Sequence, residues 1–544
     1  MDRETAHADG QAGEAKGGHS TILTHGWPAL PAAGVLVYLL LRLAFDQGGY
    51  FPAAFTPAAA IAFVALALFV IVPPRRRIRT PALVALAALA AFACWTGLSR
   101  AWSVVPDIPL LDMRRAMLYV ALFALGLLAA DSARRAGLVV WGVLGVVTVV
   151  VGVGVLSRLQ PDLISTPVLI EGAREYRLSY PLGYWNAFGA LATIGGVLAV
   201  GLAADARAAR VPRALAAGAA VLLLVAMYLS LSRGSFLALL AGVVVLLVLS
   251  RRRGTLLVSL AIVAAGVGIA LLVLRSHPAL VELARTPEAQ EAQGDAYMIR
   301  LLVLVVLAAI AQWLAAAVTI PQRMLKLMAA ARRPAIALAC AAVLLVVLAG
   351  LIVRDGAGDR PVDRLSSTIS KQWDDFVSPT APLEGAEGTA RLTSAKSSRS
   401  DTYRVAIDGF QAHPLRGEGA GSYEVRWMRD RAVDDKVRDA HSLALQTLAE
   451  LGLVGFALLA AFAGAVLFAL ARTLQGRGAL RRSQAAAVGA AFTVWLVHSS
   501  IDWDWEMPAV TGVALVLGAT LFAASGRRRR TGARRPRTSA SAAR

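Results

Sequence analysis

The chain has 544 residues, of which 57% are hydrophobic, and its mean hydropathy is +0.61. Apolar runs of about 20 residues, the length that spans the ~30 Å hydrocarbon core of a bilayer, recur from end to end. This composition excludes a soluble catalytic domain, and it predicts an all-α fold because lipid offers no partner for unpaired backbone groups. We expect a polytopic bundle of membrane helices with one large external loop that carries short helices.

About fourteen membrane spans are predicted along the chain. They cover residues 28–46, 57–73, 80–98, 114–130, 137–157, 186–204, 214–231, 235–250, 255–274, 299–318, 335–353, 443–471, 484–500 and 509–524. The first follows a polar stretch with no convincing cleavage site, so we expect it to remain as an anchor. The predicted domains are a polar cytoplasmic tail (1–27), eleven spans (28–353), the large external loop (354–440), three spans (441–524) and a basic cytoplasmic tail (525–544).

The net charge is +20, and many of the basic residues lie in the predicted loops. Basic clusters such as Arg75–Arg79, Arg251–Arg253 and Arg527–Arg530 fall in alternate loops. Because Lys and Arg concentrate on the cytoplasmic side of membrane proteins, this pattern places both termini in the cytoplasm and the large loop outside the cytoplasmic membrane. It explains the charge without nucleic-acid binding. The spans at 255–274 and 299–318 decide whether the number of spans is even or odd. Without one of them, every later loop would lie on the opposite side of the membrane.

The first polar cluster on the predicted outer face precedes the sixth span. Residues 174–186 are rich in Tyr and Trp, which commonly form a belt at the membrane interface. Arg177 and Asn186 lie at the same level of this segment. They could instead hold a sugar or a diphosphate.

Arg233 stands in a very short outer turn, residues 228–235, between two spans. One interpretation is a long side chain at a helix end whose charge reaches the water. The other is a fixed cation for a phosphate group, since a guanidinium can bind two phosphate oxygens at once. Positive-inside statistics disfavour an arginine on this face, which favours the second interpretation.

The large loop contains two segments with candidate cations. Residues 399–410 place apolar side chains at helical spacing and predict a short amphipathic helix that carries Arg399 and Arg404. Residues 413–423 form a glycine-rich turn that includes Arg416. The backbone N–H groups of this turn could approach an anion, or the turn could be purely structural.

His441 stands where the polar loop gives way to a new apolar helix. An imidazole with an ordinary pKa near 6.5 is mostly neutral at pH 7 and can accept a proton. This position at a membrane boundary is suited to proton transfer. The alternative is a helix-terminal histidine bonded to nearby backbone.

The last external turn concentrates three carboxylates and two tryptophans in residues 502–506. Asp502 and Asp504 have the spacing by which some glycosyltransferases hold a divalent metal, but a lone Asp-x-Asp is a weak signal. Asp502 could equally bind an acceptor or pair with arginines of the loop. No metal site and no cofactor is predicted.

Three motifs resemble the O-antigen ligase and O-antigen polymerase superfamily. They are Ser232-Arg233-Gly234-Ser235 at the start of a span, the run His413–Gly419, and His441-Ser442 followed by nine residues and Gly452-Leu453-Val454-Gly455. The last fits the pattern of the ligases completely. The ligases have about twelve spans, so the fourteen predicted here are a departure.

The resemblance implies an inverting, metal-independent membrane glycosyltransferase of the GT-C type. It would transfer a glycan from an undecaprenyl diphosphate carrier to an acceptor hydroxyl, in a glycan, a lipid or the cell wall, on the outer face of the cytoplasmic membrane. His441 would be the general base, and Arg233 with Arg399 or Arg404, and Arg177 in reserve, would stabilise the diphosphate. A polymerase that uses a second lipid-linked glycan as acceptor is the main alternative. A transporter of lipid-linked sugars is disfavoured because the spans contain almost no charged residues, and a non-catalytic scaffold would not need this histidine.

Overall fold

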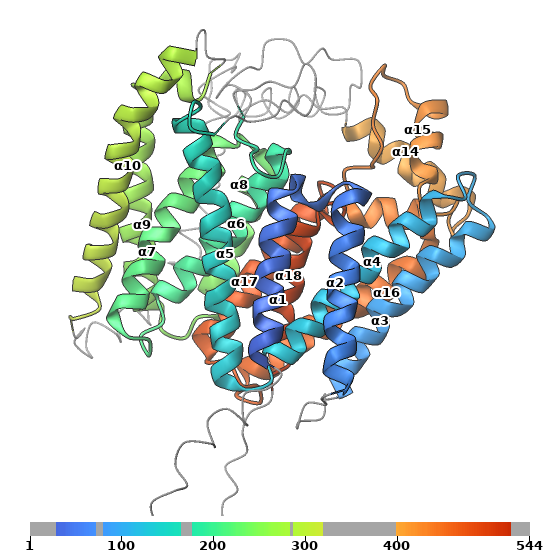
Figure 1. Ribbon diagram of the computed structural model, residues 1–544, viewed down its shortest axis with the longest axis horizontal. Helices are drawn as coiled ribbons and strands as arrows, with labels where there is room; N and C mark the ends of the chain where they lie inside the picture. Colours follow the sequence, from blue (N-terminus) through green and yellow to red (C-terminus); the bar gives the residue numbers. More distant parts are fainter. Residues whose placement is uncertain (1–28, 72–79, 165–176, 283–286, 319–398, 524–544) are drawn as a thin grey trace, which may run out of the picture.

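The computed structural model describes residues 29–71, 80–164, 177–282, 287–318 and 399–523. Within these ranges all regular elements are helices, mostly long and apolar, and no strand occurs (Figure 1). The all-α prediction is therefore confirmed. Eight of the described helices are long and apolar enough to cross a membrane, and three shorter apolar helices accompany them. The protein is a multi-pass helical membrane protein.

Thirteen of the fourteen predicted spans coincide with a helix. The helices are α1 (Ala29–Phe45), α2 (Pro52–Ile71), α3 (Thr80–Leu98), α4 (Ile108–Ala129), α5 (Ala133–Leu159), α6 (Trp185–Ala203), α7 (Arg210–Leu229), α8 (Arg233–Leu249), α9 (Arg253–Leu274), α10 (Pro287–Ala315), α16 (Leu443–Leu474), α17 (Arg482–Ser499) and α18 (Pro508–Thr520). The spans predicted at 255–274 and 299–318, which decide whether the number of spans is even or odd, are both present, as α9 and α10. The remaining span, 335–353, lies outside the described residues, so the total of fourteen stays a prediction.

Helix α6 lies at the centre of one half of the bundle, packed against α7, α8 and α17. Its side chains are buried from Ala187 to Ala203. Small residues permit this close packing: a Cβ on Gly201 would lie 2.5 Å from the Cβ of Ala487 in α17. The other half packs α3 against α4 and α16, and α4 against α2 and α18.

Two short helices cap one end of the bundle. They are α14 (Arg399–Ala412) and α15 (Ser422–Asp430), next to the start of α16 (Figure 1). The predicted amphipathic helix at 399–410 is thus present as α14. It shares a small separate core with its neighbours, made of Val405, Ala406, Tyr423, Trp427, Ala440 and Ala449. We call this the site end of the bundle and the opposite end the basic end.

Helix α16 breaks at Gly452, where the glycine-rich turn docks. Gly452 has φ +64° and ψ −164°, a conformation that is essentially restricted to glycine. The backbone of the turn enters the break, so that the Leu453 N–H donates to the carbonyl of Pro414 at 2.8 Å. A Cβ on Gly452 would lie 2.3 Å from the carbonyl oxygen of Leu415. Two sequence motifs far apart in the chain therefore meet at one place.

Backbone N–H groups of this turn donate hydrogen bonds to other backbone carbonyls of the protein. The N–H of Gly417 donates to the carbonyl of His413 at 2.8 Å, and the N–H of Gly419 donates to the carbonyl of Glu450 at 2.7 Å. Gly419 also has φ +96°, and a Cβ there would lie 2.5 Å from the Cβ of Ser103. The glycines serve close packing, and the alternative that their amides bind an anion has no support.

Candidate active site

Asp502 is the centre of a buried hydrogen-bond cluster at the site end. Its Oδ2 accepts from Arg399 Nη2 at 2.6 Å and from Asn186 Nδ2 at 2.7 Å. Its Oδ1 accepts from the Tyr184 hydroxyl at 2.9 Å and from the backbone N–H of Trp503 at 3.0 Å. The start of α6, the start of α14 and the turn after α17 are joined through this one carboxylate. Of the interpretations of Asp502, pairing with a loop arginine is the one that these contacts fit.

Burial and the Arg399 charge act on Asp502 in opposite directions. Burial is the largest single influence and favours the neutral acid, but the Arg399 guanidinium and the other neighbouring groups, including the Trp503 N–H, together keep the pKa of Asp502 below its ordinary value. The carboxylate is therefore ionised at neutral pH. A buried carboxylate and guanidinium in this geometry orient each other, which fixes the direction of the Arg399 side chain.

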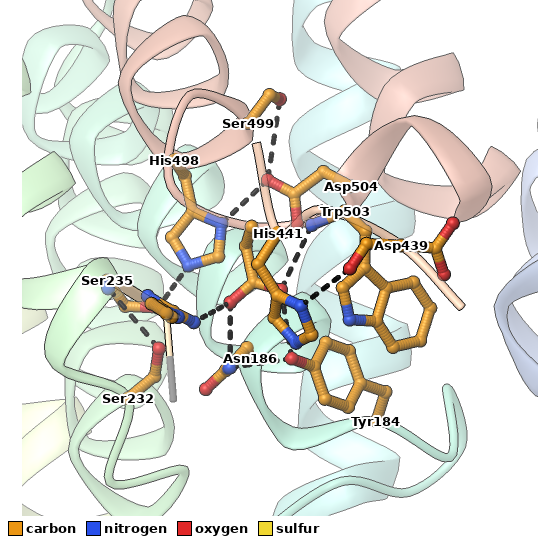
Figure 2. Close-up of polar contacts among 12 residues, drawn as sticks. Tyr184, Asn186, Ser232, Ser235, Asp439, His441, His498, Ser499, Trp503 and Asp504 are labelled. Carbon is orange, nitrogen blue, oxygen red and sulfur yellow. Dashed lines mark hydrogen bonds and ion pairs between the residues drawn. The ribbon is translucent and has the colours of Figure 1, made fainter. Parts of the chain in front are cut away.

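His441 lies beside this cluster in a strained conformation. Its φ is +53°, in the left-handed region that few residues other than glycine adopt. Its ring Nδ1 is 3.1 Å from the carbonyl oxygen of Asp439, and its ring meets that of Trp503 edge to face at 6.5 Å (Figure 2). The Tyr403 hydroxyl on α14 donates to the His441 carbonyl at 3.4 Å. Backbone strain of this kind is typical of a residue held in place for function.

The Asp439 carbonyl determines which nitrogen of His441 carries the proton. A carbonyl oxygen only accepts, so Nδ1 donates to it and Nε2 carries the lone pair. Within the described ranges Nε2 has no hydrogen-bond partner. Burial lowers the pKa of His441, with a further lowering by Arg399 and an opposing effect of Asp502. The imidazole is thus neutral at pH 7, with its basic nitrogen unengaged.

Arg177 is buried and holds the turn that leads into α8. Its Nε donates to the carbonyl of Ser230 at 3.0 Å, and its Nη2 donates to the carbonyl of Leu231 at 3.1 Å and to Asn186 Oδ1 at 3.0 Å. The guanidinium also lies 4.5 Å from the ring centre of Trp185. These contacts make Arg177 a positioning residue, with Asn186 as the link between it and Asp502.

Arg233 is the first residue of α8 and is partly exposed. Ser232 caps the helix by accepting a hydrogen bond from the N–H of Ser235 at 3.3 Å. The N-terminus of a helix favours anions and disfavours cations, so an arginine here is poorly placed for stability. The same place is well suited to a bound phosphate, because the arginine and the helix N-terminus act on it together. Arg177 connects this turn to the Asp502 cluster.

A second buried chain of polar residues was not predicted from the sequence. His498 in α17 binds Asp504 Oδ2 through Nδ1 at 2.6 Å and approaches the Ser235 hydroxyl through Nε2 at 3.3 Å (Figure 2). A Cβ on Gly234 would lie 3.1 Å from Nε2. Ser235, His498 and Asp504 have no exposed surface, so the likeness to a hydrolase triad does not provide an accessible nucleophile. These three hydrogen-bonded side chains instead fix the first turn of α8, directly after Arg233.

Two predicted candidates lie elsewhere. Arg404 binds Asp401 at 2.6 Å and Asp408 at 3.1 Å, and all three residues lie in α14. Arg416 is exposed and lies over the ring of Trp102, 5.7 Å from its centre. Neither has a contact with the Asp502 cluster. Arg399 and Arg404 were alternative predictions for the loop arginine of the site. Of the two, the structure places only Arg399 near His441.

The carboxylates of the Asp-x-Asp segment face separate partners. Asp502 binds Arg399, Asn186 and Tyr184, whereas Asp504 binds His498. In the described part of the chain no group of three His, Cys, Asp or Glu side chains is arranged to hold a metal ion.

An acidic cavity of about 90 Å³ adjoins the site on the other side of Asp439. The Asp439 carboxyl lines it together with Glu506, Arg438 and Tyr50. Burial raises the pKa of Asp439 and raises that of Glu506 well above its ordinary value. The oxygens of these carboxyl groups can accept hydrogen bonds from hydroxyl groups. These carboxyl groups can therefore contact hydroxyl groups of a molecule that is bound next to His441.

The fold and the site define a multi-pass helical membrane protein with a neutral histidine and oriented arginines at one end. Residues 296–460 match the family model described as O-antigen ligase, a segment that includes α14, α15 and His441. This match supports membership of the O-antigen ligase superfamily, and the family implies a glycosyltransferase-type enzyme that acts on lipid-linked glycans in a membrane setting. No curated protein matches the chain.

Proposed function

We propose that the protein transfers a glycan from a polyprenyl diphosphate, of the undecaprenyl type, to an acceptor hydroxyl at the site end of the bundle. His441 Nε2 removes the proton of the acceptor hydroxyl. The acceptor oxygen attacks the anomeric carbon from the face opposite the diphosphate, the carbon–oxygen bond to the diphosphate breaks, and the configuration inverts. The lipid diphosphate leaves as an anion.

The observation that carries this proposal is the state of His441. The Asp439 carbonyl fixes the proton on Nδ1, and burial keeps the ring neutral. A general base needs an unprotonated nitrogen within reach of the substrate at the working pH. The left-handed backbone at His441, with φ +53°, supports the same role, because strained conformations are frequent at active sites.

Arg233 and Arg399 supply positive charge for the leaving group. Negative charge grows on the diphosphate as the glycosidic bond breaks, and oriented cations in a water-poor site stabilise it without a metal. Asp502 orients Arg399, whereas Arg177 and the Ser235–His498–Asp504 chain fix the turn that carries Arg233. The acidic cavity beside Asp439 supports an acceptor site on the other side of His441.

The test is glycan transfer in reconstituted vesicles with a lipid-diphosphate glycan as donor and EDTA present. His441→Ala should lower the transfer rate by about 10²- to 10⁴-fold, the usual contribution of a general base. Arg233→Ala should lower it by about 10²- to 10³-fold, the usual loss for one group that stabilises developing charge. Arg429→Gln on α15 is the control, because this exposed side chain pairs with the adjacent Asp430.

Two outcomes would contradict the proposal. One is full transfer by His441→Ala in membranes that contain the same amount of protein. The other is a strict requirement for a divalent metal, which would return attention to Asp502 and Asp504. The same assay separates the two reactions of the superfamily, since chain growth on a second lipid-linked glycan identifies a polymerase, and transfer to a different acceptor identifies a ligase.

A further inference from the structure

The basic end of the bundle contains a cavity of about 540 Å³ that the proposed transfer reaction does not use. It is bounded by the turns between α6 and α7, between α8 and α9, and between α16 and α17. Helices α6, α8 and α16 begin at the site end and finish here, so the cavity and His441 lie at opposite ends of the bundle. Its volume is in the range of small-molecule binding sites.

Positive charge in the lining of this cavity is far in excess of negative charge. Asp205 is the one acidic residue in the lining, and it is already bound to Arg481 at 2.8 Å and to the Ser483 hydroxyl at 2.7 Å. The lining arginines are Arg207, Arg251, Arg252, Arg481 and Arg482.

These arginines repel one another in the absence of a ligand. Arg251 and Arg252 are exposed and have no hydrogen bond or ion pair from their side chains within the described ranges. Arg482 donates to the carbonyl of Leu474, but its Nε is buried with no partner, and Arg251 lies close enough to act on its charge. Basic residues on one side of a membrane protein need only lie in loops. The charge rule therefore does not explain why five arginines line one cavity.

Two helix N-termini add to the positive potential. Helix α9 begins at Arg253 and α17 at Arg482, and both begin without a side-chain cap. Unpaired N–H groups and the helix dipole at such an end favour an anion, whereas arginines at the same end are unfavourable until an anion is bound.

We propose that this cavity binds a phosphate group, carried by the headgroup of an acidic membrane phospholipid or by a soluble phosphate. Guanidinium groups match phosphate oxygens in a two-pronged geometry, and basic pockets between membrane helices recognise phosphorylated headgroups. The helices that end here carry the site residues at their other ends: Arg233 begins α8, and His441 immediately precedes the N-cap of α16. Phosphate bound at the basic end thus holds together the helices that present the active site.

The test compares two double variants of the full-length protein with equal loss of charge. Arg251→Gln with Arg252→Gln removes two cations from the cavity. Arg134→Gln with Arg477→Gln removes two exposed cations that do not line it, one near the start of α5 and one between α16 and α17. Thermal unfolding in neutral detergent is measured with added phosphatidylglycerol, phosphatidylcholine or inorganic phosphate, and native mass spectrometry counts the bound lipid.

We expect phosphatidylglycerol or phosphate to raise the unfolding midpoint of the wild type and of the Arg134/Arg477 variant by several degrees, but not that of the Arg251/Arg252 variant. Stabilisation by phosphatidylglycerol alone identifies a lipid headgroup, and stabilisation by inorganic phosphate identifies a soluble ligand. Without ligand, the Arg251/Arg252 variant should be at least as stable as the wild type, because repulsion is relieved. Should it fail to fold, Arg251→Gln alone tests the same point. Equal responses of all proteins, or no response of the wild type, would overturn the proposal.

Discussion

The charge environment of His441 comes from two residues of opposite sign that bind each other. Asp502 raises the pKa of His441 and Arg399 lowers it, while burial, the largest influence, lowers it. The two partners of this ion pair therefore act on the imidazole in opposite directions, and Asp439 also raises its pKa. A single substitution in the pair removes this balance, and the direction of the change depends on which partner is lost.

This balance predicts opposite pH shifts for two variants. The imidazole must be neutral to accept a proton, so kcat/KM should rise as the pH increases through the pKa of His441 and stay level above it. Because that pKa is lowered, the rise should lie below pH ~6.5 in the wild type. Asp502→Asn should move the rise to lower pH, and Arg399→Gln should move it to higher pH. The measurement is the pH profile of the residual transfer activity, and shifts in the same direction would contradict the assignment of His441 as the base.

Residue patterns predicted the candidate base but not the network around it. His441 was found because it begins a spacing motif, and Arg399 because it opens an amphipathic helix. The tasks of Arg177 and His498 depend on partners 54 and 263 residues away, which only the packing of α6, α8 and α17 brings together. Arg404, by contrast, binds Asp401 one turn earlier on its own helix α14.

At the scale of elements, hydrophobic runs predicted α1 to α10 and α16 to α18 well, because long apolar segments in lipid must be helical and eight of these helices have the length to cross a bilayer. The break in α16 was not predicted from hydropathy, since a single glycine does not interrupt an apolar run. Its signal was the glycine pair at 452 and 455 in the motif. The structure gives this spacing a physical reason: the chain at Pro414–Leu415 occupies the space beside Gly452.

Two glycine variants in α16 test this reason. Gly452→Ala forces a side chain into a backbone conformation that costs about 1–3 kcal/mol and places its Cβ against the Leu415 carbonyl. Gly464→Ala is the matched control, because a Cβ there meets nothing within 4 Å and alanine favours helix by about 1 kcal/mol. Gly452→Ala should lower the unfolding midpoint and the transfer rate together, and Gly464→Ala should lower neither. Equal tolerance of both variants would show that the docked turn can move aside.

For the whole molecule, the site and the basic cavity lie at opposite ends of one bundle, so the orientation in the membrane decides which compartment each one faces. Helix α10 finishes at the basic end and α14 begins at the site end. The fourteen-span prediction needs one crossing between them and places it at residues 335–353. The charge rule then puts the basic end in the cytoplasm and the site outside.

Single cysteines report this orientation directly. In a background with Cys94→Ala and Cys340→Ala, we expect Leu163→Cys, an exposed residue after α5, to react with a membrane-impermeant maleimide in intact cells. Arg477→Cys, exposed between α16 and α17, should react only after the membrane is permeabilised. The reverse pattern would place His441 on the cytoplasmic side, where a lipid-linked glycan would have to be used before export. It would also expose the arginine-lined cavity to the outer leaflet, so one labelling experiment tests the compartment of both sites.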